Sequence, residues 1–152
     1  MTEVPSASRH FGAAWITLCV AFAAHVADEA LTGFLEIYNP TVLALRQRYD
    51  WFPMPVFEFR EWLTGLVIAV AVLLALSPFA LRGARWLRPL AYLFAVIMLL
   101  NAVGHTLGTI FGRTLPSITF ERPMPGFYSS PFLLVASVYM LHELGRSASR
   151  SD

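Results

Sequence analysis

The chain has 152 residues, of which 57% are hydrophobic and 14% are charged, and its mean hydropathy is +0.59. Soluble domains carry about 25% charged residues, so this chain has too few ionic groups to cover a water-exposed surface. All basic residues are arginines and the formal net charge is +1, which leaves no basic stripe for nucleic acid. The single cysteine, Cys19, excludes an intramolecular disulfide or a thiolate zinc cluster. The composition therefore excludes a cytosolic enzyme and a nucleic-acid-binding domain, and it predicts an integral membrane protein.

Four apolar stretches are long enough to be membrane helices, since a bilayer takes about 20 apolar residues to span. They cover about residues 11–34, 62–81, 87–111 and 127–144. The first stretch carries Asp28 and Glu29 in its second half, and the fourth is short, with Ser129 and Ser130 near its start. Backbone hydrogen bonds must close internally in lipid. We therefore expect residues 1–152 to form one polytopic domain of the all-α class, a four-helix transmembrane bundle.

The arginines predict how the chain is oriented. Three of them crowd the short connection between the second and third spans: Arg82, Arg85 and Arg88. The positive-inside rule places that connection in the cytoplasm. Arg9 precedes the first span, and Arg146 and Arg150 follow the fourth, so all three fall on the same side. We expect a multi-pass protein of a bacterial inner membrane with both termini cytoplasmic and with His142 and Glu143 at a solvated helix end.

The longer connection after the first span is not a plain linker. Residues 41–52 suit a short interfacial helix with Val42, Leu45 and Trp51 inward, and aromatic residues follow up to the second span. Tryptophan and tyrosine favour the headgroup level of a membrane. One interpretation of this segment is an aromatic belt that anchors the bundle, and the other is a lid over a site below it.

Five polar residues stand out inside the predicted spans: His25, Asp28, Glu29, Asn101 and His105. Such side chains are costly at membrane depth and usually face the interior of a bundle. Residues three or four apart share a helix face, so each set projects to one side of its span. At about 1.5 Å per residue, His25 and Asn101 each lie about 21 Å from the start of their span, and His105 lies about 27 Å from it. The two polar faces are therefore predicted to meet at one height, in the outer half of the membrane.

These residue types suit a divalent metal. Imidazoles and carboxylates are normal ligands of zinc and of non-haem iron. We expect His25, Glu29 and His105 to hold a metal, zinc in preference to iron or manganese, with water in the fourth position. Asp28 would act as general base or would fix an imidazole tautomer, and Asn101 would donate to an oxyanion or a ligand carboxylate. Two other interpretations stay open: a structural His–Glu network between helices, and a proton or ion path.

Three short motifs follow one another along the chain. They are His-Val-Ala-Asp-Glu at residues 25–29, Asn-Ala-Val-Gly-His at residues 101–105, and Pro125-Gly126 ahead of Ser129. In these motifs the chain resembles the HXXEE-domain membrane proteins, which are marked by His-x-x-Glu-Glu on an early helix, Asn-x-x-x-His later, and Pro-Gly near the last helix. Asp28 stands where that family has glutamate. The resemblance implies a small polytopic protein suspected to be an enzyme, and it names no reaction.

The leading functional hypothesis is a membrane-embedded, metal-dependent enzyme, with hydrolysis as the first reaction class. Its partners would be membrane lipid and a lipidic or apolar small-molecule substrate that enters laterally, and not nucleic acid. A metal-free isomerase is the next hypothesis, because the same carboxylates and imidazoles suit acid–base catalysis. The rival from another class is a non-enzymatic bundle, such as a carrier, a proton path or an assembly subunit. Pro125-Gly126 has two interpretations: a purely structural turn into the last helix, which we favour, and a turn that also brings Ser129 near the polar cluster.

Overall fold

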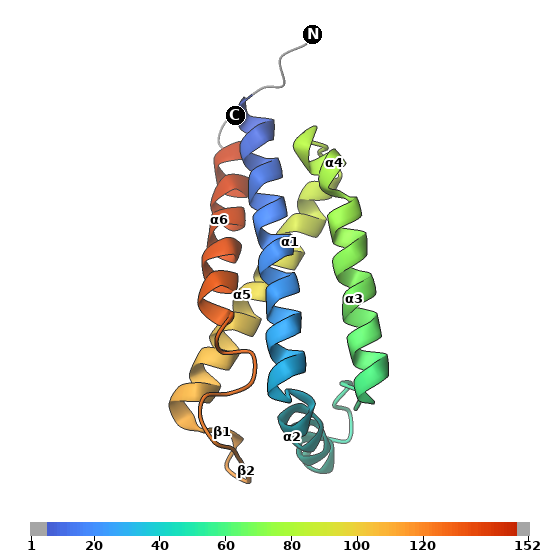
Figure 1. Ribbon diagram of the computed structural model, residues 1–152, viewed down its shortest axis with the longest axis vertical. Coiled ribbons are helices and arrows are strands. Elements are labelled where there is room, and N and C mark those ends of the chain that lie inside the picture. Colours follow the sequence, from blue (N-terminus) through green and yellow to red (C-terminus); the bar gives the residue numbers. More distant parts are fainter. Residues whose placement is uncertain (1–5, 149–152) are drawn as a thin grey trace.

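A computed structural model describes residues 6–148 of the chain, with side chains described from residue 9 to residue 146, so that Arg150 lies outside the described residues. The fold is helical, as predicted, with one small hairpin that the sequence did not indicate (Figure 1). The elements in chain order are α1 (Ser6–Thr32), α2 (Leu35–Arg48), α3 (Phe59–Ala75), α4 (Ser77–Leu81), α5 (Leu87–Phe111), β1 (Arg113–Leu115), β2 (Ile118–Thr119) and α6 (Ser130–Ala148).

Three helical segments are long and apolar enough to cross a membrane. They are Arg9–Thr32, Phe59–Leu81 and Leu87–Phe111. The third agrees with the predicted span at both ends, and the first begins a little earlier and ends at Thr32. The second segment consists of α3 and α4, with a break at Leu76. Pro78 follows this break in the first turn of α4, where its missing N–H costs no helical hydrogen bond.

Helix α6 is the fourth long element, and it begins three residues after the predicted start of the last span. It lies against both α1 and α5 (Figure 1). Its fully buried residues recur at helical spacing: Ser130, Leu133, Ala136, Ser137 and Met140. This spacing places them on one face, so α6 buries one side in the bundle and exposes the other.

The core is centred on α1 and is held by aromatic side chains. Phe94 of α5 packs edge-on against Trp15 and Phe22 of α1, with ring centroids 5.9 Å and 5.6 Å apart. Such edge-to-face pairs are favourable beyond the area they bury. The indole N–H of Trp15 donates to the carbonyl oxygen of Leu73 at 3.1 Å, and this bond ties α3 to α1. Half of the large apolar side chains of α3 and many of those on α5 remain exposed.

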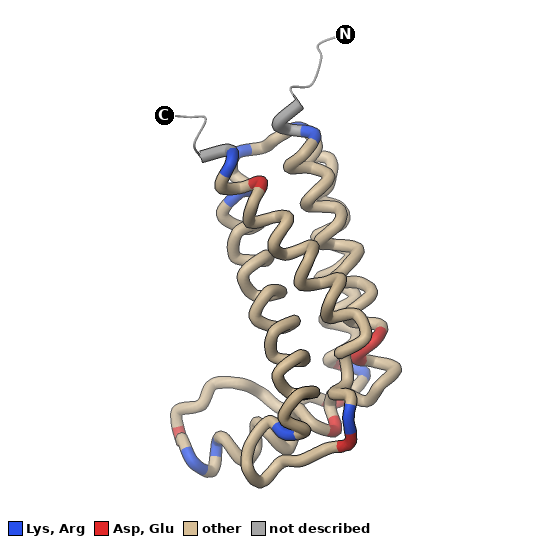
Figure 2. The backbone as a smooth tube through the Cα atoms, turned by 90° about the vertical axis from the view of Figure 1, so that its left-hand side faces the viewer, with Lys and Arg blue, Asp and Glu red and all other residues tan. Residues whose placement is uncertain are grey.

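Charged residues collect near the two ends of the bundle and leave a long uncharged stretch between them (Figure 2). The start of α1 and the turn after α4 lie at one end, where a Cβ on Gly12 would come within 2.7 Å of the Leu81 backbone. The end of α6 lies at that same end (Figure 1). Glu143 does not form a solvated helix end as predicted. It is buried, and it pairs with Arg146 at 3.3 Å, because an acidic side chain facing neighbouring helices needs a partner.

The opposite end is capped by α2 and by the hairpin of β1 and β2 (Figure 1). The helix predicted for residues 41–52 starts earlier, at Leu35, and ends at Arg48. Val42 is buried as predicted, whereas Trp51 is 77% exposed because the helix ends before it. A hydrogen bond of 2.6 Å between the hydroxyls of Thr41 and Thr114 joins α2 to β1.

Candidate metal centre

The centre of the candidate site is a buried group of two histidines and one glutamate. His25 and Glu29 lie four residues apart on α1, so they share one face, and His105 lies on α5. Glu29 Oε1 lies 3.4 Å from His25 Nε2 and 3.0 Å from His105 Nε2. All three residues are at most 5% exposed. The ligand atoms of the three side chains lie within 4.8 Å of one another.

The chemistry and spacing of this group fit a metal ion. With ligand atoms about 2.0–2.1 Å from zinc, neighbouring ligands in a tetrahedral site lie about 3.3 Å apart. The two distances to Glu29 Oε1 agree with that value. Within residues 6–148, this is the one gathering of three or more histidine, cysteine or acidic residues with metal-ligand spacing. His105 Nδ1 is buried and has no hydrogen-bond partner among the described residues, so the polar contact of this imidazole to the protein is made by Nε2, toward Glu29.

Asp28 lies beside the metal-ligand group and reaches it through Ser129, at the start of α6. Asp28 Oδ2 accepts hydrogen bonds of 2.8 Å from both the backbone N–H and the hydroxyl of Ser129. Ser129 Oγ in turn lies 2.8 Å from His25 Nδ1. Because the hydroxyl proton points to the carboxylate, Ser129 Oγ accepts from Nδ1–H of His25. His25 Nε2 is thereby left with a lone pair, which faces Glu29 Oε1 and the side-chain nitrogen of Asn101 and which a metal ligand requires.

Asn101 approaches the same imidazole from α5. Its side-chain nitrogen lies 3.2 Å from His25 Nε2 and, with the imidazole proton on Nδ1, donates a hydrogen bond to it; the residue is partly exposed. The second N–H of this amide can donate to an acceptor bound at the centre. The structure thus brings together all five polar residues that the sequence singled out.

Gly126 explains why the Pro-Gly motif stands before α6. Its φ is +84°, a left-handed conformation that favours glycine. A Cβ here would lie 2.8 Å from His105 Nδ1 and 2.9 Å from Glu29 Cγ, so the backbone itself covers the centre. The N–H of Gly126 donates to Thr32 Oγ1 at 3.2 Å. This turn is not purely structural, as the sequence analysis favoured, because it also places Ser129 at the polar cluster.

Two residues that the sequence analysis did not single out complete the walls. The ring of Phe34 lies 5.5 Å from the His105 ring, centroid to centroid. Met124 is buried and occupies the space over Gly108 that a side chain would otherwise fill. Both come from segments that join helices, and neither shows a periodic signal that would have marked it in the sequence.

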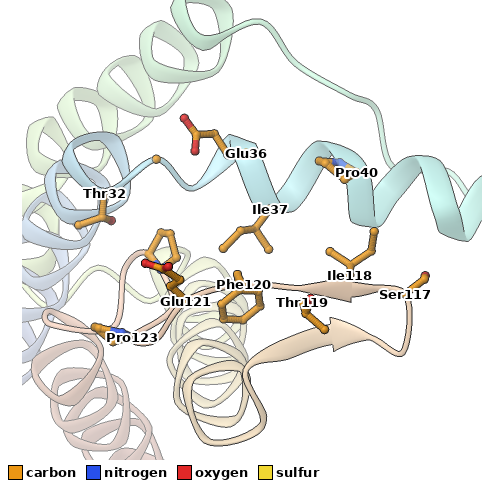
Figure 3. A pocket seen from close by; sticks show the side chains of 12 residues that line it. Thr32, Glu36, Ile37, Pro40, Ser117, Ile118, Thr119, Phe120, Glu121 and Pro123 are labelled. Carbon is orange, nitrogen blue, oxygen red and sulfur yellow. The ribbon is translucent and has the colours of Figure 1, made fainter.

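A groove of about 440 Å³ opens onto the centre along α5, and its lining includes Asn101, His105, Phe34 and Met124. A second cavity, of about 570 Å³, lies between α2 and the segment from the hairpin to Pro125 (Figure 3). Glu36 and Glu121 line that second cavity, and none of the five predicted site residues does. The groove, and not the larger cavity, therefore gives access to the candidate metal centre.

Comparison of the chain with protein-family models, with curated proteins and with solved structures finds no match.

Proposed function

We propose that this protein is a membrane-embedded, metal-dependent enzyme that hydrolyses a lipidic substrate. The observation that carries the proposal is the buried group of His25, Glu29 and His105, with ligand atoms within 4.8 Å of one another, beside a groove that reaches His105 and Asn101. Buried imidazole and carboxylate groups at membrane depth are costly, and they mark functional sites more often than structural ones.

The proposed setting is a bundle of four membrane spans. Helix α6 has 19 residues and lies along α1 and α5, two of the helices that could cross a membrane. A helix of this length covers about 28 Å at 1.5 Å per residue, close to the thickness of the hydrocarbon layer. With the arginine-rich end in the cytoplasm, the metal centre lies in the outer half of the membrane. The three sequence motifs further support membership of the HXXEE-domain proteins.

Each residue of the site has a defined task in this proposal. His25, Glu29 and His105 hold the metal, with zinc preferred because it accepts two imidazoles, one carboxylate and an open position. A metal held there polarises a carbonyl oxygen and lowers the pKa of water. Asp28 and Ser129 hold His25 in the ligating tautomer. Asn101 donates a hydrogen bond to the oxygen of the substrate that gains negative charge.

The reaction class is tested by the fate of solvent oxygen. Purified protein in nanodiscs is incubated with a membrane lipid extract in heavy-oxygen water, with zinc and after removal of metal by a chelator. We expect a new lipid product that carries solvent oxygen and forms only when metal is present. Products of unchanged mass would indicate the isomerase, and unchanged lipids with metal-loaded protein would indicate a non-enzymatic bundle. The variant His142→Ala, which alters an exposed histidine on α6, serves as the control.

A further inference from the structure

The groove beside the metal centre has an apolar wall and a cation at its outer end. The wall is formed by α5, the α1–α2 turn and the segment before α6, and its apolar members are Phe34, Leu100, Leu107, Phe111 and Met124. Arg113, the first residue of β1, also lines the groove. Leu100, Leu107 and Phe111 are among the exposed residues of α5, so the groove is open on its side and not only at its end.

Arg113 is exposed, and within the described part of the chain its guanidinium has neither an ion pair nor a hydrogen bond. A second arginine stands close by, because the side chain of Arg122 packs over Gly112, the residue before Arg113. The nearest acidic residue in sequence, Glu121, faces the other cavity. A planar guanidinium without a partner is a ready receptor for a carboxylate or phosphate, which it binds through two parallel hydrogen bonds.

We propose that this groove binds one chain of an anionic amphiphile from the membrane, with the headgroup on Arg113 and the apolar chain along α5 past His105 and Asn101. The inference deepens the proposed function by naming the substrate class. Charge complementarity selects the headgroup, and the apolar wall selects the chain. The volume of about 440 Å³ falls in the range of about 300–1,000 Å³ that is usual for small-molecule sites. The lateral opening allows entry directly from the lipid layer.

Gly104 makes the groove testable, because it lines the groove and a Cβ built on it meets no atom within 4 Å. A larger side chain at this position therefore fills the groove without displacing the fold. Gly65 of α3 is a matched control, since a Cβ there also meets nothing within 4 Å and it does not line the groove. Gly104→Leu and Gly65→Leu make the same change in two exposed helix faces.

The experiment uses a palmitate that carries a photoactivatable diazirine in its chain, in phosphatidylcholine nanodiscs with protein stripped of metal. Labelled residues are identified by mass spectrometry, and unlabelled palmitate or methyl palmitate competes. We expect labelling along the groove, competition by palmitate and weak competition by the uncharged ester. Arg113→Gln should raise the palmitate concentration needed for half-competition about tenfold, because the substitution removes one charge-assisted contact to the carboxylate. Gly104→Leu should abolish groove labelling, and Gly65→Leu should leave it unchanged.

Equal competition by palmitate and its methyl ester, or unchanged competition after Arg113→Gln, would overturn the proposal. Labelling spread over α3 as strongly as over the groove would also overturn it, because it would show non-specific contact with lipid. Arg113→Gln alters an exposed side chain, so it remains informative if Gly104→Leu does not fold. The labelling test uses protein free of metal, so its outcome does not depend on the metal-dependent reaction. Failure of this proposal and failure of the proposed function can therefore be told apart.

Discussion

The hydroxyl of Ser129 bridges the carboxylate of Asp28 and the imidazole of His25. This hydroxyl lies 2.8 Å from Asp28 Oδ2 and 2.8 Å from His25 Nδ1. Outer partners of this kind orient a ligating histidine and raise its basicity, and their removal lowers metal affinity about 10–100-fold. Ser129 is thus a positioning residue that acts through His25.

Ser129→Ala should lower zinc affinity about 10–100-fold without unfolding the protein, because the backbone N–H of residue 129 still reaches Asp28. Competition with a chromophoric chelator measures the affinity. The control is Ser137→Ala, which removes a buried hydroxyl of α6, the helix that Ser129 precedes; this hydroxyl donates only to the Leu133 carbonyl oxygen. An equal loss of affinity in both variants would show a general effect on α6 and no specific role of Ser129.

Gly126→Ala should damage the centre in two ways. The left-handed φ of +84° costs a non-glycine residue about 1–3 kcal/mol, and the new Cβ would press on His105 and Glu29. We expect a lower Tm together with loss of zinc binding, measured by thermal unfolding in detergent with and without zinc. Gly65→Ala, where the Cβ meets no atom within 4 Å, should leave zinc binding unchanged and should not lower the Tm, because alanine favours a helix more than glycine does. Normal zinc binding by Gly126→Ala would contradict the close cover that the backbone forms over the centre.

The residues of the candidate site could be predicted from the sequence in part. The spacing of three and four residues on two helices identified His25, Asp28, Glu29, Asn101 and His105, because helix periodicity is local. Phe34 lies in the turn between α1 and α2, and Met124 lies in the non-periodic path between Phe111 and Ser130, so these two walls could not be inferred. A place for Ser129 near the cluster was only the less favoured interpretation of the Pro-Gly turn, because its link between Asp28 and His25 depends on the tertiary placement of α6.

The packing of α1 against the α4 turn depends on Gly12. A Cβ on this residue would lie 2.7 Å from the Cα of Leu81, so the two backbones approach closely, as small residues permit in membrane helices. Gly12→Ala should therefore destabilise the protein by about 1–3 kcal/mol, the usual cost of overpacking, although alanine favours a helix more than glycine does. Thermal unfolding measures the change, and a Tm equal to that of Gly65→Ala would contradict the close approach.

The elements differ in how well they follow from sequence. The span at 87–111 agrees with α5 because it is a long apolar run that ends at Gly112, whose φ of +65° closes the helix. The sequence suggested a helix that begins after Pro40, but α2 begins before this residue, at Leu35. Pro40 is only the sixth residue of α2, so its missing N–H forfeits one bond to the Glu36 carbonyl oxygen. The hairpin of β1 and β2 was missed because its strands are two or three residues long.

The whole molecule places its charges at two ends, and the ends differ in composition. Arg85 lies in the short turn between α4 and α5, and Glu121 lies two residues after β2. The α4 turn and the hairpin stand at opposite ends of the bundle (Figure 1). On a background of Cys19→Ala, Arg85→Cys should react with a membrane-impermeant maleimide only after the cells are opened. Glu121→Cys should react in intact cells. The reverse pattern would invert the proposed topology, and reaction of both in intact cells would contradict four spans.

The central claim is that two helices bring three side chains together as one metal centre inside the membrane. Elemental analysis of protein purified in detergent, combined with zinc titration, tests it most directly. We predict near-stoichiometric metal in the wild-type chain and in His142→Ala, an exposed histidine outside the centre, and no bound metal in a folded His105→Ala. Equal zinc binding by His105→Ala and the wild type, or a wild-type protein that takes up no metal in titration, would contradict the account.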